Sequence, residues 1–327
     1  PDTTVRLERG EEGRQSMQVA AGLPMVSDDG PHISIRKRPD RPPTPTELVG
    51  RGPLTPLIVS IVWLLAEHRG AVLFTGPDGA RPATALAAHT PFVPEQQRPV
   101  IVETGGPSVS LPHETAVALS QDGPPSTGEK SDAGRSIERT ALNPDLEIVP
   151  AMRSDREYER LAEALADGRG VFAAARAATR EVFVREGETK GLPPHLVARF
   201  DLVVELPAPG TDRPAIGWLP VETRSVREDQ AERDADVDPT CDIYWHRIGA
   251  GSTDDEDALS AALLENLAEE LALAPTDLQA TLTRRRRYVA YLREESVTDR
   301  EELMGFLADL RTDEAATIER IRNERDR

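Results

Sequence analysis

The sequence predicts an α/β fold built on a largely parallel β-sheet, and three observations support this prediction. Between Gly70 and about Leu206, short apolar runs alternate with segments of helical pattern, as in strand–helix–strand units. One apolar run leads straight into a glycine turn and a helix start, in AVLFTGPDGARPATALAAHT from Ala71 to Thr90. The chain has 327 residues, which is enough for two domains or for one large domain with appendages.

The N-terminal region is predicted to be a short strand followed by a linker. Residues 1–30 are polar apart from one short apolar patch, and Ile33-Ser34-Ile35 alternates like the end of a strand. The basic cluster Arg36-Lys37-Arg38 leads into the proline-rich stretch RPDRPPTPTELV. Thr46 with Glu47 is expected to open a short helix. Residues 54–68 then form a predicted buried helix.

The alternating region gives the predicted core. Its strands are expected at 71–74, 100–102, 147–149, 170–173 and 202–206. Its helices are expected at 83–89, 135–141, 156–167 and 194–200. The stretch 121–133, QDGPPSTGEKSDA, has low complexity and reads as an insert between them.

The remainder is predicted to be a β extension followed by helices. Residues 217–248 contain two strand-like runs around an acidic insert, and the chain turns helical beyond Gly251. The expected organisation has four parts. They are a remnant of an N-terminal domain with its linker (1–45), the α/β core (46–210), a small β extension (211–250) and a C-terminal helical region (251–327).

The charge of the chain is strongly acidic. The formal net charge is −18, and lysine occurs only at Lys37, Lys130 and Lys190. Acidic surfaces with little lysine suit high salt, which screens their repulsion, so we expect a halophilic source. A GC-rich genome, favouring Arg and Ala codons, explains the same bias, and the two interpretations are compatible. The acidity also argues against nucleic acid as a partner.

Cysteine content and hydropathy exclude further classes of protein. Cys241 stands alone, so an intrachain disulfide is excluded and a cysteine-based zinc site is not expected; we interpret it as a strand residue. The histidines do not cluster at metal-ligand spacing, so no metal is predicted. The longest apolar run, LIVSIVWLLA from Leu57, is shorter than the roughly 18 residues of a membrane span. We therefore expect a cytoplasmic protein.

The segment after the first core strand has the frame of a phosphate-binding loop. In G-x-x-x-x-G-K-[ST], backbone N–H groups and the lysine hold phosphates, and the hydroxyl binds magnesium. Gly76 and Gly79 remain here, with Arg81, Pro82 and Ala83 at the positions of the second glycine, the lysine and the hydroxyl. We take Gly76, Gly79, Arg81 and Thr84 as a degenerate nucleotide-binding set. The alternative is an ordinary strand–turn–helix corner.

Other candidate motifs are weaker. GPPSTGEKS, residues 123–131, looks like a phosphate loop with one extra residue, but no apolar strand precedes it. We interpret it as an insert and keep Lys130 as a remote phosphate ligand. The run Arg284–Arg287 spreads around a helix, and we expect it to pair with the acidic helix 254–270 rather than with nucleic acid. His113 is interpreted as a structural histidine.

The order of the segments resembles the motor ATPases of type II and type IV secretion systems and archaeal pili. The resemblance covers about residues 15 to 320 and implies a RecA-like P-loop core in a degenerate haloarchaeal member. Its specificity comes from order and spacing. The matching segments are ISIRKRPDRPPTPTELV, LTPLIVSIVWLLAEHRGAVLFTG, ETGGPSVSLPHE, PDLEIVPAMRSDREYERLAEALADGRG, GLPPHLVARFDLVVEL and RRRRYVAYLREESVTDREELMGFLADLR.

The resemblance also assigns roles to individual positions. Glu103 lies near the place of the carboxylate that polarises the attacking water. The Walker B motif Gly-Glu-Val-Arg-Gly is replaced by PAMRS, so Ala151 stands in place of the glutamate. Arg169 and Arg176 occupy the two positions of the histidine box. Arg36 and Arg38 match a segment that presents arginines to nucleotide, with a solvated basic turn as the alternative.

Three hypotheses follow. The favoured one is a non-hydrolysing relative that acts as an assembly or regulatory subunit, in an oligomer with an active paralogue and a membrane platform protein. It would need no cofactor and would meet the inner face of the membrane only through its partners. The alternative is an active ATPase that uses ATP and Mg with Glu103, Arg81, Arg169 and Arg176. The third is an unrelated halophilic scaffold.

Overall fold

The computed structural model divides the chain into two compact units, Pro1–Pro42 and Pro43–Arg327. The residues that the structure describes are 3–7, 17–22, 32–37, 42–103, 111, 116–120, 143–152, 154–211, 215–222, 235–237, 243–248, 259 and 261–325. The first unit contains an antiparallel three-stranded sheet in the order β1-β2-β3. Its strands are β1 (Thr3–Leu7), β2 (Met17–Gly22) and β3 (His32–Lys37).

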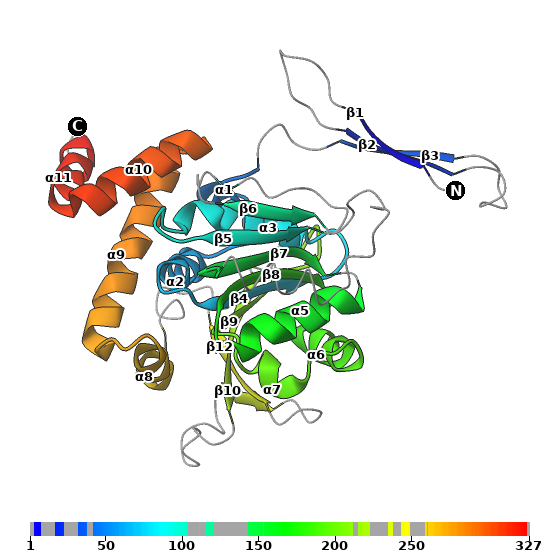
Figure 1. Cartoon of the computed structure of the whole chain (residues 1–327). Coiled ribbons are helices and arrows are strands. Elements are labelled where there is room, and N and C mark those ends of the chain that lie inside the picture. The colour runs from blue at the N-terminus through cyan, green and yellow to red at the C-terminus, as the bar shows by residue number, and fades with distance from the viewer. Residues whose placement is uncertain are drawn as a thin grey trace. The chain divides into compact units, whose positions relative to one another are not determined.

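The second unit is built on a nine-stranded sheet in the order β11-β12-β10-β9-β4-β8-β7-β5-β6 (Figure 1). Six strands are mutually parallel: β9 (Leu202–Glu205), β4 (Ala71–Gly76), β8 (Gly170–Arg176), β7 (Leu146–Met152), β5 (Pro99–Glu103) and β6 (Val117–Ser120). The other three, β10 (Ile216–Glu222), β12 (Ile243–Ile248) and β11 (Ala235–Val237), continue the same sheet in antiparallel pairing.

Helices cover both faces of this sheet (Figure 1). One face carries α2 (Pro56–Glu67) and α3 (Pro82–His89), and the other carries α5 (Asp155–Ala166), α6 (Arg180–Thr189) and α7 (Pro194–Val197). Successive residues of β4 supply both cores, because strand side chains alternate between faces: Val72 and Phe74 join the first core, and Leu73 the second. All six residues of β4 are buried, as its uninterrupted apolar run requires.

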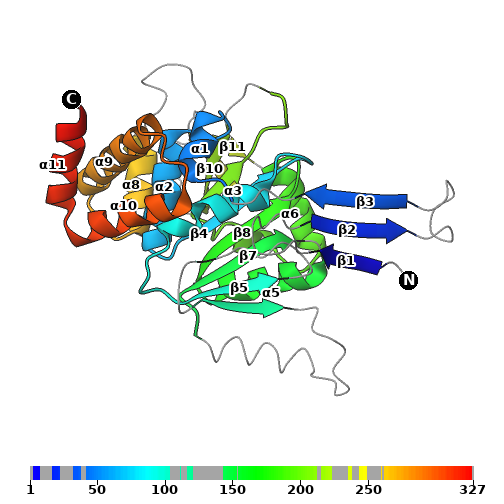
Figure 2. The same cartoon turned by 90° about the horizontal axis from the view of Figure 1, so that it is seen from above.

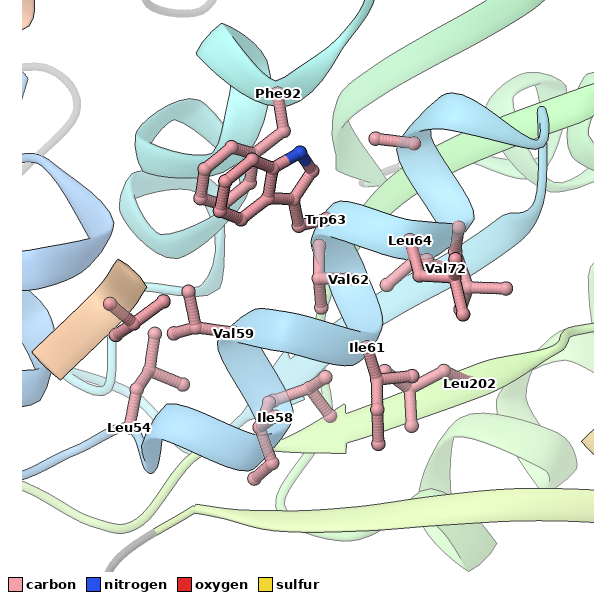
Figure 3. Close-up of a cluster of buried hydrophobic side chains, with 14 of the residues drawn as sticks. Leu54, Ile58, Val59, Ile61, Val62, Trp63, Leu64, Val72, Phe92 and Leu202 are labelled. Atoms are coloured by element: carbon pink, nitrogen blue, oxygen red, sulfur yellow. The ribbon is translucent and has the colours of Figure 1, made fainter. Parts of the chain in front are cut away.

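Helix α2 supplies much of the apolar core on the face of the sheet that it covers. Ten of its twelve residues are buried, so it is a core helix rather than an amphipathic surface helix. Ile61 lies beside Leu202 of β9, and Trp63 lies against Phe92 (Figure 3). The rings of Trp63 and Phe92 are stacked with centroids 4.8 Å apart. Phe92 belongs to the 3₁₀ turn η1 (Thr90–Phe92), which continues α3.

The C-terminal helices pack against the α2 side of the core. They are α8 (Ala261–Glu270), α9 (Pro275–Glu294), α10 (Arg300–Thr312) and α11 (Glu314–Arg325). Helix α9 lies alongside α2 (Figure 2), and its Leu278, Leu282 and Val289 are buried in the same core as α2. In the described part of the chain, no helix has the length and hydropathy to cross a membrane.

The linker helix α1 (Pro45–Gly50) joins the C-terminal helices to the core. Its cap is Thr44, whose hydroxyl accepts from the Glu47 N–H at 3.3 Å while the Glu47 carboxylate accepts from the Thr44 N–H at 3.0 Å, a capping box. The cap thus lies two residues before the predicted Thr46. The buried Thr46 hydroxyl instead donates to the carbonyl of Val297 at 2.8 Å.

The predicted fold class is confirmed in its broad form: an α/β core built on a largely parallel sheet, with a C-terminal helical region. The five predicted core strands are present, as are the predicted helices at 83–89 and 156–167. The predicted helix 194–200 is shorter, and α6 and β6 were not predicted. The predicted helix 135–141 lies outside the described residues.

Candidate functional site

The candidate site is the loop of residues 77–81, which joins the carboxyl end of β4 to the start of α3. Strand β4 lies between β9 and β8 in the middle of the parallel region. Ligand sites of open α/β sheets lie outside the carboxyl ends of the strands, so the loop occupies the expected place. The ends of β8 at Arg176 and of β5 at Glu103 lie on the same edge of the sheet.

Neighbouring residues of the protein leave no room for a side chain at either glycine, Gly76 or Gly79. A Cβ added to Gly76 would lie 2.9 Å from the Cβ of Ala80 and 3.1 Å from that of Leu206. Gly79 has φ +88°, and a Cβ there would lie 2.6 Å from Cγ of Pro209. Residues of the segment after β9 therefore pack directly against the loop. Sequence reasoning missed Pro209, because nothing in the motif itself points to a residue 130 positions away.

Arg81 keeps the backbone conformation of a glycine. Its φ and ψ are 60° and 55°, in the left-handed region, which costs a non-glycine residue about 1–2 kcal/mol. Its carbonyl accepts from the N–H groups of Thr84 at 2.9 Å and Ala85 at 3.2 Å, which starts α3. Glycine adopts this conformation without a steric cost, so the backbone at Arg81 suits the glycine that the resemblance expects, whereas the arginine side chain does not.

The first turn of α3 lacks the groups that bind phosphate. Pro82 is buried at its N-terminus and has no N–H to point at an anion. Ala83 brings a methyl group where the resemblance places the hydroxyl that binds magnesium. The N–H of Thr84 is engaged by the Arg81 carbonyl. The turn therefore offers a phosphate neither the lysine charge nor the metal ligand.

An exposed ion pair lies at the rim of the loop. Asp78 Oδ1 is 3.6 Å from Nη1 of Arg176, with the two side chains 90% and 61% exposed. An exposed pair contributes only about 0–1 kcal/mol to stability. Its effect on the site is electrostatic, because the carboxylate of Asp78 offsets the positive charge that Arg176 would otherwise offer to an anion in the loop.

The end of β4 is fixed by the protein on both sides. The buried Thr75 hydroxyl donates to the carbonyl of Ala177 after β8, at 3.1 Å. The N–H of Leu206 after β9 donates to the carbonyl of Thr75 at 2.8 Å. Both neighbouring strands therefore position the start of the loop.

The other positions that the resemblance assigned lie along β7 and β5. Ala151 lies near the carboxyl end of β7, where the pairing with β8 is irregular between Val149 and Met152. Pro150 has no N–H for the ladder, which accounts for the irregularity. The Ala151 methyl cannot order water or metal. Glu103 ends β5 at the correct edge, and its side chain lies outside the described part of the structure.

The two histidine-box positions lie at opposite ends of β8. Arg176 ends the strand beside the loop, whereas Arg169 precedes it at the amino edge of the sheet. There Arg169 forms ion pairs with Glu147, at 3.3 Å, and with Asp167. The structure therefore brings Arg176 to the candidate site and places Arg169 in an ion-pair network away from it.

The other sequence candidates are outside the described part of this unit. Arg36 belongs to β3 in the first unit, and the structure does not describe Arg38, His113, Lys130 or Cys241. The predicted pairing of the Arg284–Arg287 run with helix 254–270 is wrong for two members: Arg284 pairs with Glu314 of α11, and Arg285 with Glu67 of α2. Among the described residues, no group of three His, Cys, Asp or Glu could hold a metal ion.

Comparison with known proteins gives fold neighbours but no family assignment. No family model matches the sequence. An uncharacterized protein of Methanocaldococcus jannaschii is 26% identical over 150 residues, which are 43% of this chain and 52% of the relative. The chain thus spans about half the length of the curated relative that it matches.

The solved structures to which this chain shows some similarity include secretion and pilus ATPases, with TM-scores below 0.5. The Legionella pneumophila ATPase DotB is 15% identical with a TM-score of 0.44, over 94% of this chain and 77% of that one. The pilus retraction motor PilT is 14% identical with a TM-score of 0.42, over 82% and 68%. The Brucella suis VirB11 ATPase is 17% identical with a TM-score of 0.37, over 62% and 71%.

Proposed function

We propose that this chain is a relative of the secretion and pilus motor ATPases that has kept the fold and lost ATP hydrolysis. The single observation that carries the proposal is the start of α3. Arg81 holds a left-handed backbone conformation at the position of the second glycine, and Pro82 and Ala83 stand where the resemblance places the lysine and the hydroxyl.

The physical argument concerns charge and metal binding. Phosphoryl transfer is catalysed by positioning and by neutralising charge around magnesium. Losing a donor that stabilises the developing charge typically costs about 3–4 kcal/mol. The missing lysine, hydroxyl and Walker B carboxylate would each impose a loss of this kind. Asp78 also offsets the charge of Arg176, so the combined rate would be close to that of the uncatalysed reaction.

We further propose that the chain acts as an assembly or regulatory subunit. Thr75, Leu206 and Pro209 hold its loop in place, and we expect the core to keep its shape without nucleotide. The subunit would then be a structural component of the assembly that does not drive it by ATP hydrolysis. The expected partners are an active paralogue in an oligomeric ring and a membrane platform protein. The expected location is the inner face of the membrane of a halophilic archaeon.

One observation favours the alternative, an ATPase with an atypical site. Arg176 lies at the rim of the loop and is well exposed, as is Arg81. Guanidinium groups bind phosphate in bidentate fashion. Two arginines could therefore replace the charge of the missing lysine, with Glu103 as the catalytic carboxylate and ATP and magnesium as ligands.

A turnover assay separates the two functions. The purified protein, in molar salt with ATP and Mg²⁺, should release phosphate no faster than the buffer does. The same assay on Glu103→Gln controls for contaminating ATPases, because a contaminant would be unaffected by the substitution. Turnover by the wild type that Glu103→Gln abolishes would contradict the proposal and support the active enzyme.

A further inference from the structure

A histidine is buried at the junction between α3 and η1. His89 is the last residue of α3, and its side chain is fully buried. The centroid of its ring lies 5.2 Å from that of Phe74 in β4 and 5.9 Å from that of Phe92 in η1. The ring therefore forms part of the packing between the sheet and the 3₁₀ turn.

One nitrogen of this ring has a hydrogen-bond partner and the other has none. Nδ1 lies 2.7 Å from the carbonyl oxygen of Ala85, and because a carbonyl only accepts, Nδ1 carries the proton of the neutral ring. Nε2 is then an acceptor, and it has no hydrogen-bond partner in the described part of the structure. A second proton, on Nε2, would place a charged donor in the core without an acceptor, which is costly.

The charged groups around α3 are engaged with other residues. The elements packed most closely against α3 are α1, α2, β4, β7, β8 and η1, and β4 and η1 contain no charged residue. The others contribute one charged side chain each, and each of these is paired elsewhere: Glu47 with Arg51, Glu67 with Arg285, Glu147 with Arg169, and Arg176 with Asp78. The other nearby histidine, His68 just after α2, is acted on by the same Arg285 and Glu67.

The turn after His89 is held by two arginines of α10. The guanidinium of Arg300 donates to Thr90 Oγ1 at 2.7 Å, and that of Arg311 donates to the carbonyl of Phe92 at 3.0 Å. Both arginines are cations, so neither can compensate a positive charge on His89. Because η1 follows His89 directly, the packing of this ring and the docking of α10 depend on the same turn.

We propose that His89 is a proton-sensitive joint, which holds η1 in place for α10 while the ring is neutral and loosens the docking of α10 when the ring is protonated. A charged ring would move from the core into water, and η1 would move with it. Thr90 and Phe92 would then lose the positions from which they accept from Arg300 and Arg311. The joint needs no nucleotide, so it does not depend on the proposed loss of ATP hydrolysis.

The pH range of the joint follows from the same burial. Burial lowers the pKa of His89 from 6.5 to about 4, and the hydrogen bond to Ala85 opposes this shift to a smaller extent. A pKa that is lower in the packed state than in the open state gives stability that is complete above the open-state value. That stability is lost as the pH falls towards the packed-state value. The joint should therefore loosen as the pH falls from about 6.5 to about 4.

Hydrogen exchange measured on the full chain from pH 7 to pH 5 tests the proposal, because exposed carboxylates titrate mainly below this range. Protection factors corrected for intrinsic exchange report the opening constants of residues 83–92 and of α10, residues 300–312. In the wild type both opening constants should rise by about 20-fold across this range. Residues 56–67 of α2 should remain more protected at each pH, which distinguishes opening of the joint from global unfolding.

Two neutral variants isolate the imidazole. His89→Phe keeps an aromatic ring beside Phe74 and Phe92, and His89→Asn keeps a donor for the Ala85 carbonyl. Neither side chain can be protonated, so neither variant should show the rise. His195→Asn, which removes an exposed histidine of α7, is the control and should keep the wild-type profile.

Three results would overturn the proposal. The first is a wild-type profile that stays flat from pH 7 to pH 5, and the second is a rise that persists in both His89→Phe and His89→Asn. The third is a rise that is not specific to the joint, either confined to residues 83–92 with α10 unchanged or shared equally by α2.

Discussion

At the scale of the residue, Arg81 shows how the loop retains a backbone that its sequence no longer suits. The left-handed conformation of Arg81 is one that glycine adopts without a Cβ clash. It persists because the surrounding loop is held by Gly76, Pro209 and the first turn of α3. The strained conformation of Arg81 therefore comes from the course of the surrounding backbone and not from a contact of the arginine side chain.

This strain can be measured. Arg81→Gly should stabilise the protein by about 1 kcal/mol relative to Arg81→Ala, because both remove the guanidinium and only glycine relieves the Cβ clash. Urea unfolding of the two variants gives the difference. Equal stabilities would mean that the loop relaxes around alanine and that the conformation of Arg81 stores no strain.

At the scale of the element, the contact between α1 and the α9–α10 turn fastens the C-terminal helices to the linker. The Thr46 hydroxyl and the Val297 carbonyl are both in the buried interior. Because Thr44 Oγ1 lies 3.5 Å from the same carbonyl, it is the weaker donor. The contact therefore depends mainly on a single hydroxyl group.

Thr46→Val keeps the shape of this side chain and removes its donor. It should lower the free energy of unfolding by about 1–3 kcal/mol, since a buried acceptor left without its partner carries its desolvation cost. Thr312→Val is the matched control: its hydroxyl bonds the Ala308 carbonyl within an exposed helix, and its effect should stay within about 0.5 kcal/mol. A loss of unfolding free energy equal to that of the control would show that the Thr44 hydroxyl alone satisfies the Val297 carbonyl.

The elements also show where sequence reasoning succeeds. The core strands follow from unbroken apolar runs such as Ala71–Phe74, because strands buried on both faces leave no polar alternation. By contrast, α6 was missed because its apolar residues are few and its signal is confined to the Thr179 cap.

The candidate site, too, has features that the sequence predicts and features that it does not. The sequence predicts the loop and its missing side chains, since both are local features. It does not predict the contact of Pro209 with Gly79 or the ion pair of Asp78 with Arg176. It also grouped Arg169 with Arg176, although the strand predicted at 170–173 lies between them and β8 places them at opposite ends.

At the scale of the whole molecule, we propose an ATPase fold that has been kept without its chemistry. Helices cover both faces of the sheet and bury their apolar residues against it, and the C-terminal helices share the core of α2. Four positions where the resemblance expects other residues lie towards the carboxyl edge, at Arg81, Pro82, Ala83 and Ala151, whereas Arg169 lies at the amino edge. In this proposal the packed core has been kept while residues that act on nucleotide have been replaced.

Calorimetric titration of the full chain with ATP and Mg²⁺ tests this account most directly. The wild type should give no saturable heat up to millimolar ATP. The variant Arg81→Gly/Pro82→Lys/Ala83→Thr, which restores the loop glycine, lysine and hydroxyl, is the comparison, and any gain in affinity should appear only there. Saturable micromolar binding by the wild type, weakened at least ten-fold by Arg176→Ala, would contradict the central claim.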